Sequence, residues 1–317
     1  MLSRAPLALN EQEGRNAQPA APPVKVILIT GAGRSGSTLL MRLIGEHPDC
    51  LSVGEVWSIW TRGVRDGKVC GCGRAVDQCP LWSKALRDVG VDPRALVQGA
   101  YGDSLKLHLT ALSSPSAAAR SSARHGELLM NAVRQAGASF VCDSSKVPGY
   151  ARMLYRAPWA QVFPIHLVRD PRAVLNSHFR RLGALGARDR MLSAARISLF
   201  WVVRNVYHEV VARAHRTPMP RVTYESLVES VPLVQHETWA RAGVGPGSAP
   251  SRRDDNHHPI GGHDVARTRG VDVVADEGWL SQLGKSERMI ATVLTWPLLR
   301  RYGYPVVRSV RSASALA

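Results

Sequence analysis

The chain has 317 residues, 45% of them hydrophobic, so it is long enough to bury a full core and suits one large α/β domain. Its five cysteines are an odd number, and a chain of this size needs no disulfide framework for stability. The formal net charge is +16, and 35 of the 41 basic residues are arginine. Such a charge fits nucleic acid, an anionic membrane or a polyanionic small ligand, although the planar arginine fork is particularly suited to phosphate and sulfate.

The two ends of the chain read as flexible tails. Residues 1–23 combine prolines and alanines with an apolar run, Ala5 to Leu9, that is too short for a signal peptide or a membrane span. We therefore predict a tail over 1–23, a single folded domain over 24–305 and a second tail over 306–317. We expect no transmembrane segment and a cytoplasmic location.

The folded part begins with a strand, a glycine-rich turn and a helix in direct succession. Val24 to Thr30 is a continuous apolar and β-branched run, which is typical of a strand buried on both faces of a parallel sheet. Gly31 to Thr38 form the turn, and a helical stripe through Ile44 ends before Pro48.

The rest of the pattern alternates strands with helices. It predicts strands at 139–142, 162–168 and 220–223, a long helix at 194–214, and a final helix at 286–301 that Pro297 should kink or end. Residues 62–125 read as a helical insertion, and the glycine-rich stretch 243–262 as a loop or lid. The predicted fold class is α/β, a single domain with a central, mainly parallel sheet flanked by helices.

The turn after the first strand matches a phosphate loop in all but one position. Gly31-x-x-x-x-Gly36-Ser37-Thr38 fits the pattern G-x-x-x-x-G-K-[ST] except that Ser37 replaces the lysine. The backbone N–H groups and the helix N-terminus still bind an anion, but the residue that reaches the β- and γ-phosphates of a nucleoside triphosphate is missing. Arg34 and the hydroxyls of the turn can supply donors to a shorter 5′-anion. The alternative is a turn that serves packing alone.

A second motif follows the predicted strand at 162–168. Arg169 ends this strand, Asp170-Pro171 is typical of a helix start, and Ser177 lies eight residues after Arg169, nearly two turns along the helix. The two side chains can therefore approach one anion from a strand end and a helix face.

These two motifs carry a family resemblance. Gly33 to Leu40 resembles the 5′-phosphosulfate loop of sulfotransferases that use 3′-phosphoadenosine-5′-phosphosulfate (PAPS), and its continuation through His47 to Glu55 resembles carbohydrate and tyrosylprotein sulfotransferases. The stretch from Leu167 to Ser177 resembles the family's 3′-phosphate site. The resemblance implies a sulfotransferase fold similar to phosphate-loop NTPases, with PAPS as donor and 3′-phosphoadenosine-5′-phosphate (PAP) as product. The implied nucleotide-binding residues are Gly33, Arg34, Ser35, Gly36, Ser37, Thr38, Arg169, Ser177, Tyr224 and Arg267. At Arg267 the chain departs from the usual motif G-N-P-x-R by one extra residue.

The resemblance also implies a general base and its partners. Glu55, 21 residues after Arg34, matches the base of tyrosylprotein sulfotransferases, and Lys146 with Arg34 is implied to stabilise charge on the bridging oxygen. With Trp57 and Trp60 nearby, we expect an apolar setting that raises the pKa of Glu55. The alternatives are a solvated Glu55 and a Lys146 that only caps a strand end.

The cysteines do not by themselves predict a metal site. Cys70, Cys72 and Cys79 are one ligand short of a zinc tetrad, which His47 or His125 could complete. A cysteine pair, or ordinary buried thiols, fits the pattern better. His257, His258 and His263 could bind a metal, but a solvated loop is favoured for them. We therefore expect no metal.

Two other functions compete with sulfuryl transfer. A phosphate-loop kinase or nucleotidase is disfavoured by Ser37, and a nucleic-acid-binding protein by the absence of aromatic residues between the arginines of 180–196. The predicted function is transfer of a sulfuryl group from PAPS to an acceptor hydroxyl, with no nucleic-acid partner. Sugar, lipid, peptide and small-molecule acceptors all stay open, as does the oligomeric state.

Overall fold

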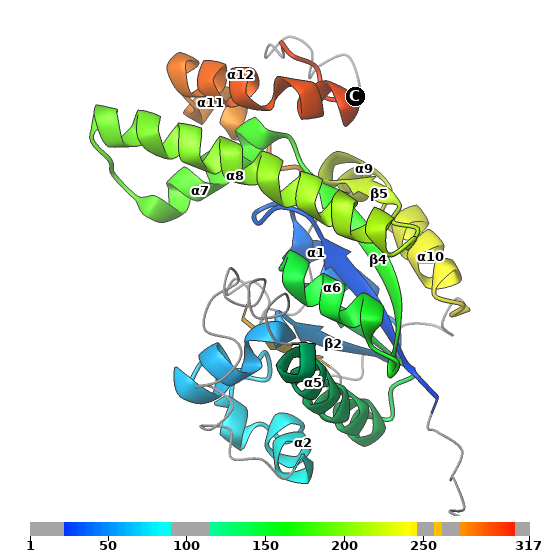
Figure 1. The fold of residues 1–317 in the computed structure, drawn as a ribbon. Helices are drawn as coiled ribbons and strands as arrows, with labels where there is room; N and C mark the ends of the chain where they lie inside the picture. The colour runs from blue at the N-terminus through cyan, green and yellow to red at the C-terminus, as the bar shows by residue number, and fades with distance from the viewer. Residues whose placement is uncertain (1–21, 90–114, 246–256, 262–272, 308–317) are drawn as a thin grey trace, which may run out of the picture.

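A computed structural model describes residues 22–89, 115–245, 257–261 and 273–307. Its centre is a six-stranded sheet in the order β5-β4-β1-β3-β2-β6, and every strand pair of this sheet is parallel (Figure 1). The predicted fold class is confirmed, and the sheet is all-parallel rather than mainly parallel. The strands are β1 (Val24–Thr30), β2 (Cys50–Gly54), β3 (Phe140–Asp143), β4 (Ala160–Val168), β5 (Arg221–Thr223) and β6 (His257–Ile260).

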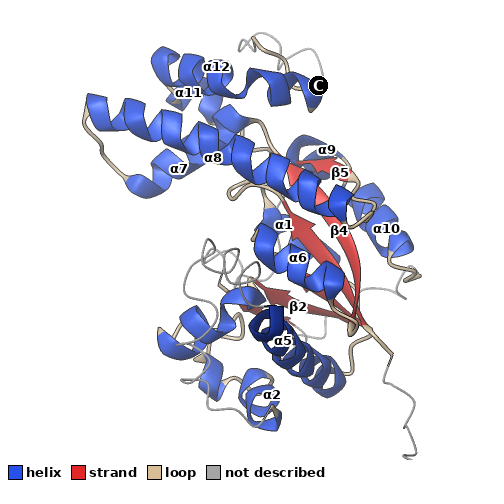
Figure 2. Ribbon diagram, in the orientation of Figure 1, coloured by secondary structure: helices blue, strands red, loops and turns tan. Residues whose placement is uncertain are grey.

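Strand β1 lies in the middle of the sheet because its residues are apolar on both faces. Val26 and Leu28 face a core shared with helices α5 (Pro115–Ala136) and α6 (Pro148–Arg156). Ile27 and Ile29 face the opposite core, shared with α1 (Ser37–Ile44) and α10 (Val231–Arg241). Figure 2 shows the resulting layers, with helices on both sides of the strands. Both faces of the sheet are thus covered, as parallel strands require.

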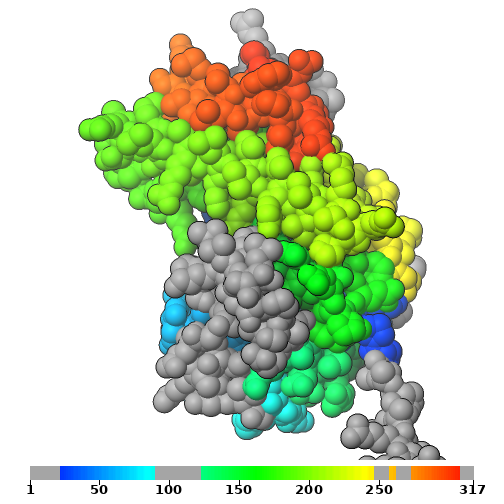
Figure 3. Space-filling view, viewed as in Figure 1, coloured from blue at the N-terminus to red at the C-terminus, as the bar shows by residue number. Residues whose placement is uncertain are grey.

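A further group of helices packs near the carboxyl ends of β1 and β4. It consists of α7 (Pro171–Leu182), α8 (Ala187–Ala214), α11 (Trp279–Gln282) and α12 (Lys285–Arg301). Buried Trp201 on α8 shares a cluster with Ala32 of the β1–α1 turn and with Leu299 on α12. Figure 3 shows the C-terminal helices, orange to red, packed along α8. This layer therefore supports the turn that follows β1 from outside the sheet.

The described part of the segment predicted as a helical insertion, 62–89 and 115–125, combines several kinds of helix. It includes the end of the π-helix η2 (Ile59–Arg65), the 3-10 helix η3 (Val76–Gln78) and α2 (Trp82–Asp88), and the 3-10 helix η1 (Val56–Ser58) precedes it. Helix α5 continues through residue 125 to Ala136, so the helical part is longer than predicted. Among the helices that the structure describes, none combines the length and the apolarity needed to cross a membrane.

One local prediction was wrong and another was confirmed in its bounds. The stretch 243–262 is not loop throughout, because β6 pairs with β2 inside it and its side chains are largely buried. A strand of only four residues is too short to show the alternation of apolar and polar residues by which strands are predicted from sequence. The predicted final helix is confirmed as α12, which runs through Pro297 to Arg301, so Pro297 does not end it. Val293, whose carbonyl loses its helical partner at Pro297, is exposed, so water can replace that hydrogen bond.

The short helix α9 (Tyr224–Glu229) carries Tyr224 towards the site. It begins directly after β5, and Thr223 caps it by accepting a hydrogen bond from the Ser226 N–H at 3.0 Å. This cap sets the position of Tyr224 at the first turn of α9.

Candidate active site

The turn after β1 requires glycine at both ends. Gly31 has φ 117°, and a Cβ there would lie 2.3 Å from the carbonyl oxygen of Leu167. Gly36 has φ 93°, and its Cβ would lie 2.6 Å from the ring of Tyr224. Between them Arg34 also has a positive φ of 68°, which is uncommon for a residue with a side chain. The backbone is thus held in a shape that packing against β4 and Tyr224 enforces.

The same turn has unused hydrogen-bonding capacity. The Ser35 hydroxyl is buried and has no hydrogen-bond partner in the described structure. Ser37 and Thr38 stand in the first turn of α1, which holds no acidic residue. Gly33 has open space around it. An orphaned buried hydroxyl at a helix N-terminus fits an anionic group, because the helix dipole and free N–H groups favour negative charge there.

Four predicted nucleotide-binding residues converge beside this turn, although they come from four separate segments. Arg34 donates a hydrogen bond from Nε to the Ser177 hydroxyl at 3.0 Å. The guanidinium of Arg169 stacks over the Tyr224 ring at 4.0 Å. We call Arg34, Arg169, Ser177 and Tyr224 the arginine end of the site. The start of α7 sets the spacing, since the Asp170 carboxylate accepts the N–H of Arg172 at 2.9 Å and Pro171 occupies the first helical turn.

A carboxylate that the sequence motifs did not reveal lies at the arginine end. Asp276 pairs with Arg180 at 2.5 Å and with Arg169 at 3.0 Å. Hydrogen bonds from Arg180 and Arg169 hold the pKa of Asp276 far below its ordinary value. The buried Nε of Arg169 still has no partner in the described structure. Burial, together with Arg181, Arg180 and Arg169, lowers the pKa of Arg34, so the surroundings of Arg34 favour an added anion.

A second charged group lies at the end of β2. The Glu55 carboxylate pairs with Lys146 Nζ at 3.0 Å and with Arg62 Nη1 at 2.9 Å. Its backbone N–H donates to the Ile260 carbonyl at 2.7 Å, which ties it to β6. We call Glu55, Lys146 and Arg62 the glutamate end. Glu55 is 19% exposed in its side chain, so it is not a freely solvated acid.

The predicted rise in the pKa of Glu55 was wrong. Burial by itself raises this pKa, but the charges and hydrogen bonds of Lys146 and Arg62 outweigh burial and hold it below its ordinary value. The side chain is consequently a carboxylate near neutral pH and can accept a proton.

Lys146 reaches Glu55 from the turn after β3. The buried Asp143 carboxylate fixes this turn by accepting the Ser145 N–H at 2.7 Å and the Tyr150 hydroxyl at 2.8 Å. Burial raises the pKa of Asp143 to about 6. Lys146 also donates to the Ser144 carbonyl at 2.6 Å, so the same ammonium group both caps the end of β3 and pairs with Glu55. Asp143 is engaged within the core, unlike an aspartate that holds a metal beside a phosphate loop.

Because the sheet is parallel, the arginine end and the glutamate end of the site both lie at the carboxyl ends of its strands. Arg169 follows β4, the glycine turn follows β1, Lys146 follows β3 and Glu55 follows β2. Because these strands are neighbours in the order β4-β1-β3-β2, the groups are arrayed in that order along the carboxyl edge. Three steps of about 4.8 Å separate β4 from β2, so the two ends lie on the order of 14 Å apart.

Sequence reasoning found some of these residues and missed others. Arg62 lies on a π-helix, which has no recognisable periodicity, and Asp276 lies in an irregular segment, so neither carried a signal. Arg180 was considered only as one of the arginines of 180–196, although its position three residues after Ser177 on α7 places the two on one helix face. Arg267 lies outside the described residues.

Comparisons with known proteins agree with this arrangement of motifs. The family model described as "Sulfotransferase family" matches residues 26–234, which is more than half of the chain. A search of curated protein sequences found no match.

Solved structures give a likeness of fold at low identity. The sulfotransferase domain of the Synechococcus PCC 7002 olefin synthase is 21% identical, with a TM-score of 0.49, and the match covers 86% of this chain and 95% of that one. The sulfotransferase domain of the curacin biosynthetic pathway is 18% identical, with a TM-score of 0.46 and coverage of 86% and 98%. A sulfotransferase from Alicyclobacillus acidocaldarius is 15% identical, with a TM-score of 0.42 and coverage of 89% and 94%. On the strength of the family model, which spans the glycine turn, the arginine end and Glu55, this chain belongs to the sulfotransferase family.

Proposed function

We propose that the protein transfers a sulfuryl group from PAPS to an acceptor hydroxyl and releases PAP. The observation that carries this proposal is the convergence of Arg34, Ser177, Arg169 and Tyr224 beside a phosphate loop that has serine in place of lysine. Such a site has donors for two separate anions, as a nucleotide with both a 5′- and a 3′-anion requires.

The glycine turn accounts for the 5′-phosphosulfate. The backbone N–H groups at the start of α1 and the hydroxyls of Ser35, Ser37 and Thr38 are hydrogen-bond donors suited to its oxygens. A triphosphate would need the absent lysine at position 37, so the turn favours the shorter anion.

The arginine end accounts for the 3′-phosphate. In the described structure the carboxylate of Asp276 forms ion pairs with Arg169 and Arg180, the groups that we propose for the 3′-phosphate. A phosphate offers more acceptor oxygens than a carboxylate and can also use the unpaired Nε of Arg169. Binding of the nucleotide would then replace a contact within the chain by a stronger one.

The glutamate end accounts for the acceptor. In an in-line displacement the acceptor oxygen forms a bond to sulfur while the bond from sulfur to the bridging phosphate oxygen breaks, and PAP leaves. Glu55 is a carboxylate and takes the acceptor proton, while Lys146, beside it, and Arg34 offset the charge that develops on the bridging oxygen. Arg62 holds the second carboxylate oxygen of Glu55 and so orients it.

A thermal-shift assay tests the donor. In a thermal-shift assay, PAP should raise the melting temperature of the protein more than ATP with magnesium does, since only PAP uses both anion sites. The Arg169→Ala variant is the matched control and should lose most of the PAP effect. A larger shift with ATP and magnesium would instead support a phosphate-loop kinase or nucleotidase.

Turnover tests the reaction itself. The protein, with no magnesium added, should transfer label from sulfur-labelled PAPS to a hydroxyl compound among fractionated host metabolites. An absolute requirement for magnesium would contradict the mechanism, because the described site supplies its own cations.

A further inference from the structure

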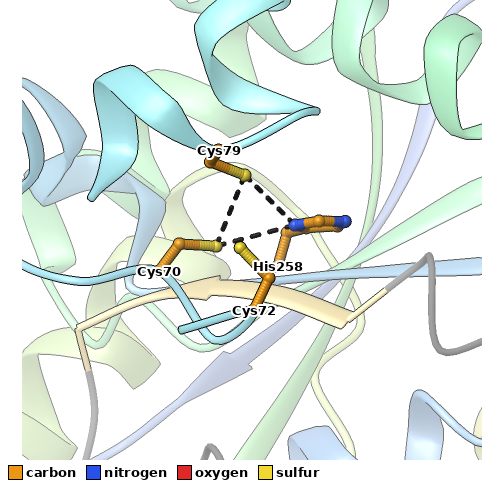
Figure 4. A group of neighbouring side chains, drawn as sticks. All are labelled: Cys70, Cys72, Cys79 and His258. Carbon is orange, nitrogen blue, oxygen red and sulfur yellow. Dashed lines mark hydrogen bonds between the residues drawn. The ribbon is translucent and has the colours of Figure 1, made fainter. Parts of the chain in front are cut away.

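Three cysteines and one histidine meet away from the arginine end of the site. Cys70 and Cys72 lie between η2 and η3, Cys79 precedes α2, and His258 lies on β6, about 180 residues further along the chain (Figure 4). Their Sγ and Nδ1 atoms all lie within 4.8 Å of one another. Four metal-ligating side chains from three segments are therefore gathered around one point.

The separations match a tetrahedral metal site. Cys70 Sγ and Cys79 Sγ are 3.7 Å apart, and His258 Nδ1 lies 3.6 Å from the first and 3.2 Å from the second. A tetrahedron with metal–sulfur bonds of about 2.3 Å has sulfur–sulfur edges of about 3.8 Å. A disulfide would need the two sulfur atoms at about 2.05 Å, so the pair is not bonded.

The surrounding backbone is shaped for this cluster. Cys70 and Cys72 occupy a tight turn in which the Cys70 N–H donates to the Arg74 carbonyl at 2.8 Å and the Gly73 N–H donates to the Cys70 carbonyl at 2.9 Å. Gly71 packs so closely on β6 that a Cβ would lie 2.3 Å from Pro259. The turn therefore reaches the strand that carries His258.

The backbone of the other two ligands is also held by hydrogen bonds, and the Cys79 carbonyl accepts the Ser83 N–H at 2.9 Å. The Trp82 indole N–H donates to the His258 carbonyl at 2.9 Å, which links α2 to β6. Cys70 and Cys79 are fully buried, and His258 is only 5% exposed. The expectation of a solvated loop at His258 was thus wrong. His47 and His125, the partners considered from sequence, lie elsewhere, bonded to the Gly245 carbonyl and the Tyr150 hydroxyl respectively.

We propose that Cys70, Cys72, Cys79 and His258 bind one structural zinc ion that clamps edge strand β6 to the segment between η2 and α2. Three thiolates and an imidazole suit Zn²⁺, and four protein ligands leave no open position for catalysis. The clamp also acts on the glutamate end, because the Glu55 N–H bonds to Ile260, two residues after His258. From the sequence we expected no metal; the position of His258 is the reason for the new proposal.

Metal analysis of the full chain is the direct test. Protein purified under reducing conditions from a zinc-containing medium should carry about one zinc ion per chain, and the cobalt-substituted form should show thiolate-to-cobalt charge transfer and tetrahedral d–d absorption. Protein without metal, a disulfide between Cys70 and Cys79 by mass under non-reducing conditions, or bound iron with sulfide would each overturn the proposal.

Substitutions at the exposed ligand Cys72 keep this test independent of folding failures. Cys72 is exposed, so Cys72→Ser should fold but lose the bound zinc, whereas Cys72→His should retain it. The matched control is Cys142→Ala, which removes a buried thiol outside the cluster and should leave the zinc content unchanged. Removal of zinc by a chelator should lower the melting temperature of the wild type, and added zinc should restore it. Zinc retained in both Cys72→Ser and Cys79→Ser would refute the assignment.

Discussion

The arginine end and the glutamate end of the site lie on one sheet edge but are built differently. At the arginine end, each strand passes directly into a glycine turn or a capped helix, so β1 with α1 and β4 with α7 carry their side chains as local units. At the glutamate end, Glu55 depends on a π-helix, on the turn after β3 and on strand β6. The elements that carry the arginine end are thus each formed by local sequence signals, although they meet only in the fold, whereas the glutamate end lacks such local signals and depends on long-range packing.

The largest expected effect is at Glu55, where binding and chemistry should separate. Glu55→Gln keeps the shape of the side chain but cannot take the acceptor proton, so kcat should fall by about 10²–10⁴ while PAP affinity stays near wild type. Kinetics, PAP titration and melting temperature on one preparation test this. Exposed Glu229→Gln is the control and should behave as wild type. A Glu55→Gln enzyme that keeps more than about half of its kcat on an alcohol would remove Glu55 from the mechanism.

The next effect is at Arg169 and probes the other end. Arg169→Ala should weaken PAP by about 10- to 150-fold and adenosine 5′-phosphosulfate far less, because a hydrogen bond to a charged group contributes roughly 1.5–3 kcal/mol and the second ligand lacks the 3′-phosphate. Equilibrium titration of both ligands measures the difference. Equal weakening of the two would show that Arg169 has another role.

A smaller effect, of opposite sign, is expected at Asp276. Asp276→Asn removes the carboxylate that pairs with Arg169 and Arg180, so PAP affinity should rise by about 1.5- to 5-fold, the range for a partly exposed ion pair of about 0.2–1 kcal/mol. Adenosine 5′-phosphosulfate should bind as before. The control is Asp66→Asn, which breaks a pair at the surface. If PAP affinity falls instead, Asp276 orients the arginines rather than competing with the phosphate.

The smallest effect is a shift in pH dependence. Arg62 favours the carboxylate form of Glu55, so Arg62→Ala should raise the pKa of Glu55 towards its ordinary value. The base is active above its pKa, and the acid limb of the kcat/KM profile should therefore move to higher pH. Arg65→Ala, which removes a neighbouring exposed arginine, should leave the limb in place. A profile that Arg62→Ala does not move would exclude Glu55 as the titrating group.

Much of the fold was open to prediction because its signals are local. The apolar run of β1, the glycine turn and the Asp170-Pro171 helix start each occupy a few consecutive residues, and the strands predicted near β3, β4 and β5 were confirmed. Strand β6 was missed because four residues in a glycine-rich stretch have no periodicity, and only pairing with β2 makes them a strand.

The sequence by itself determined the class of the fold, the glycine turn after β1 and the spacing of Arg169 and Ser177, since backbone propensity and helix geometry act over a few residues. The tertiary structure decided which distant groups meet. It paired Glu55 with Lys146 and Arg62, and thereby lowered the pKa of Glu55 where local apolar neighbours had suggested a rise. It also gathered Cys70, Cys72 and Cys79 around His258. Electrostatic and metal-ligand interactions depend on separation in space, and that separation is set by the packing of the whole sheet and its helices.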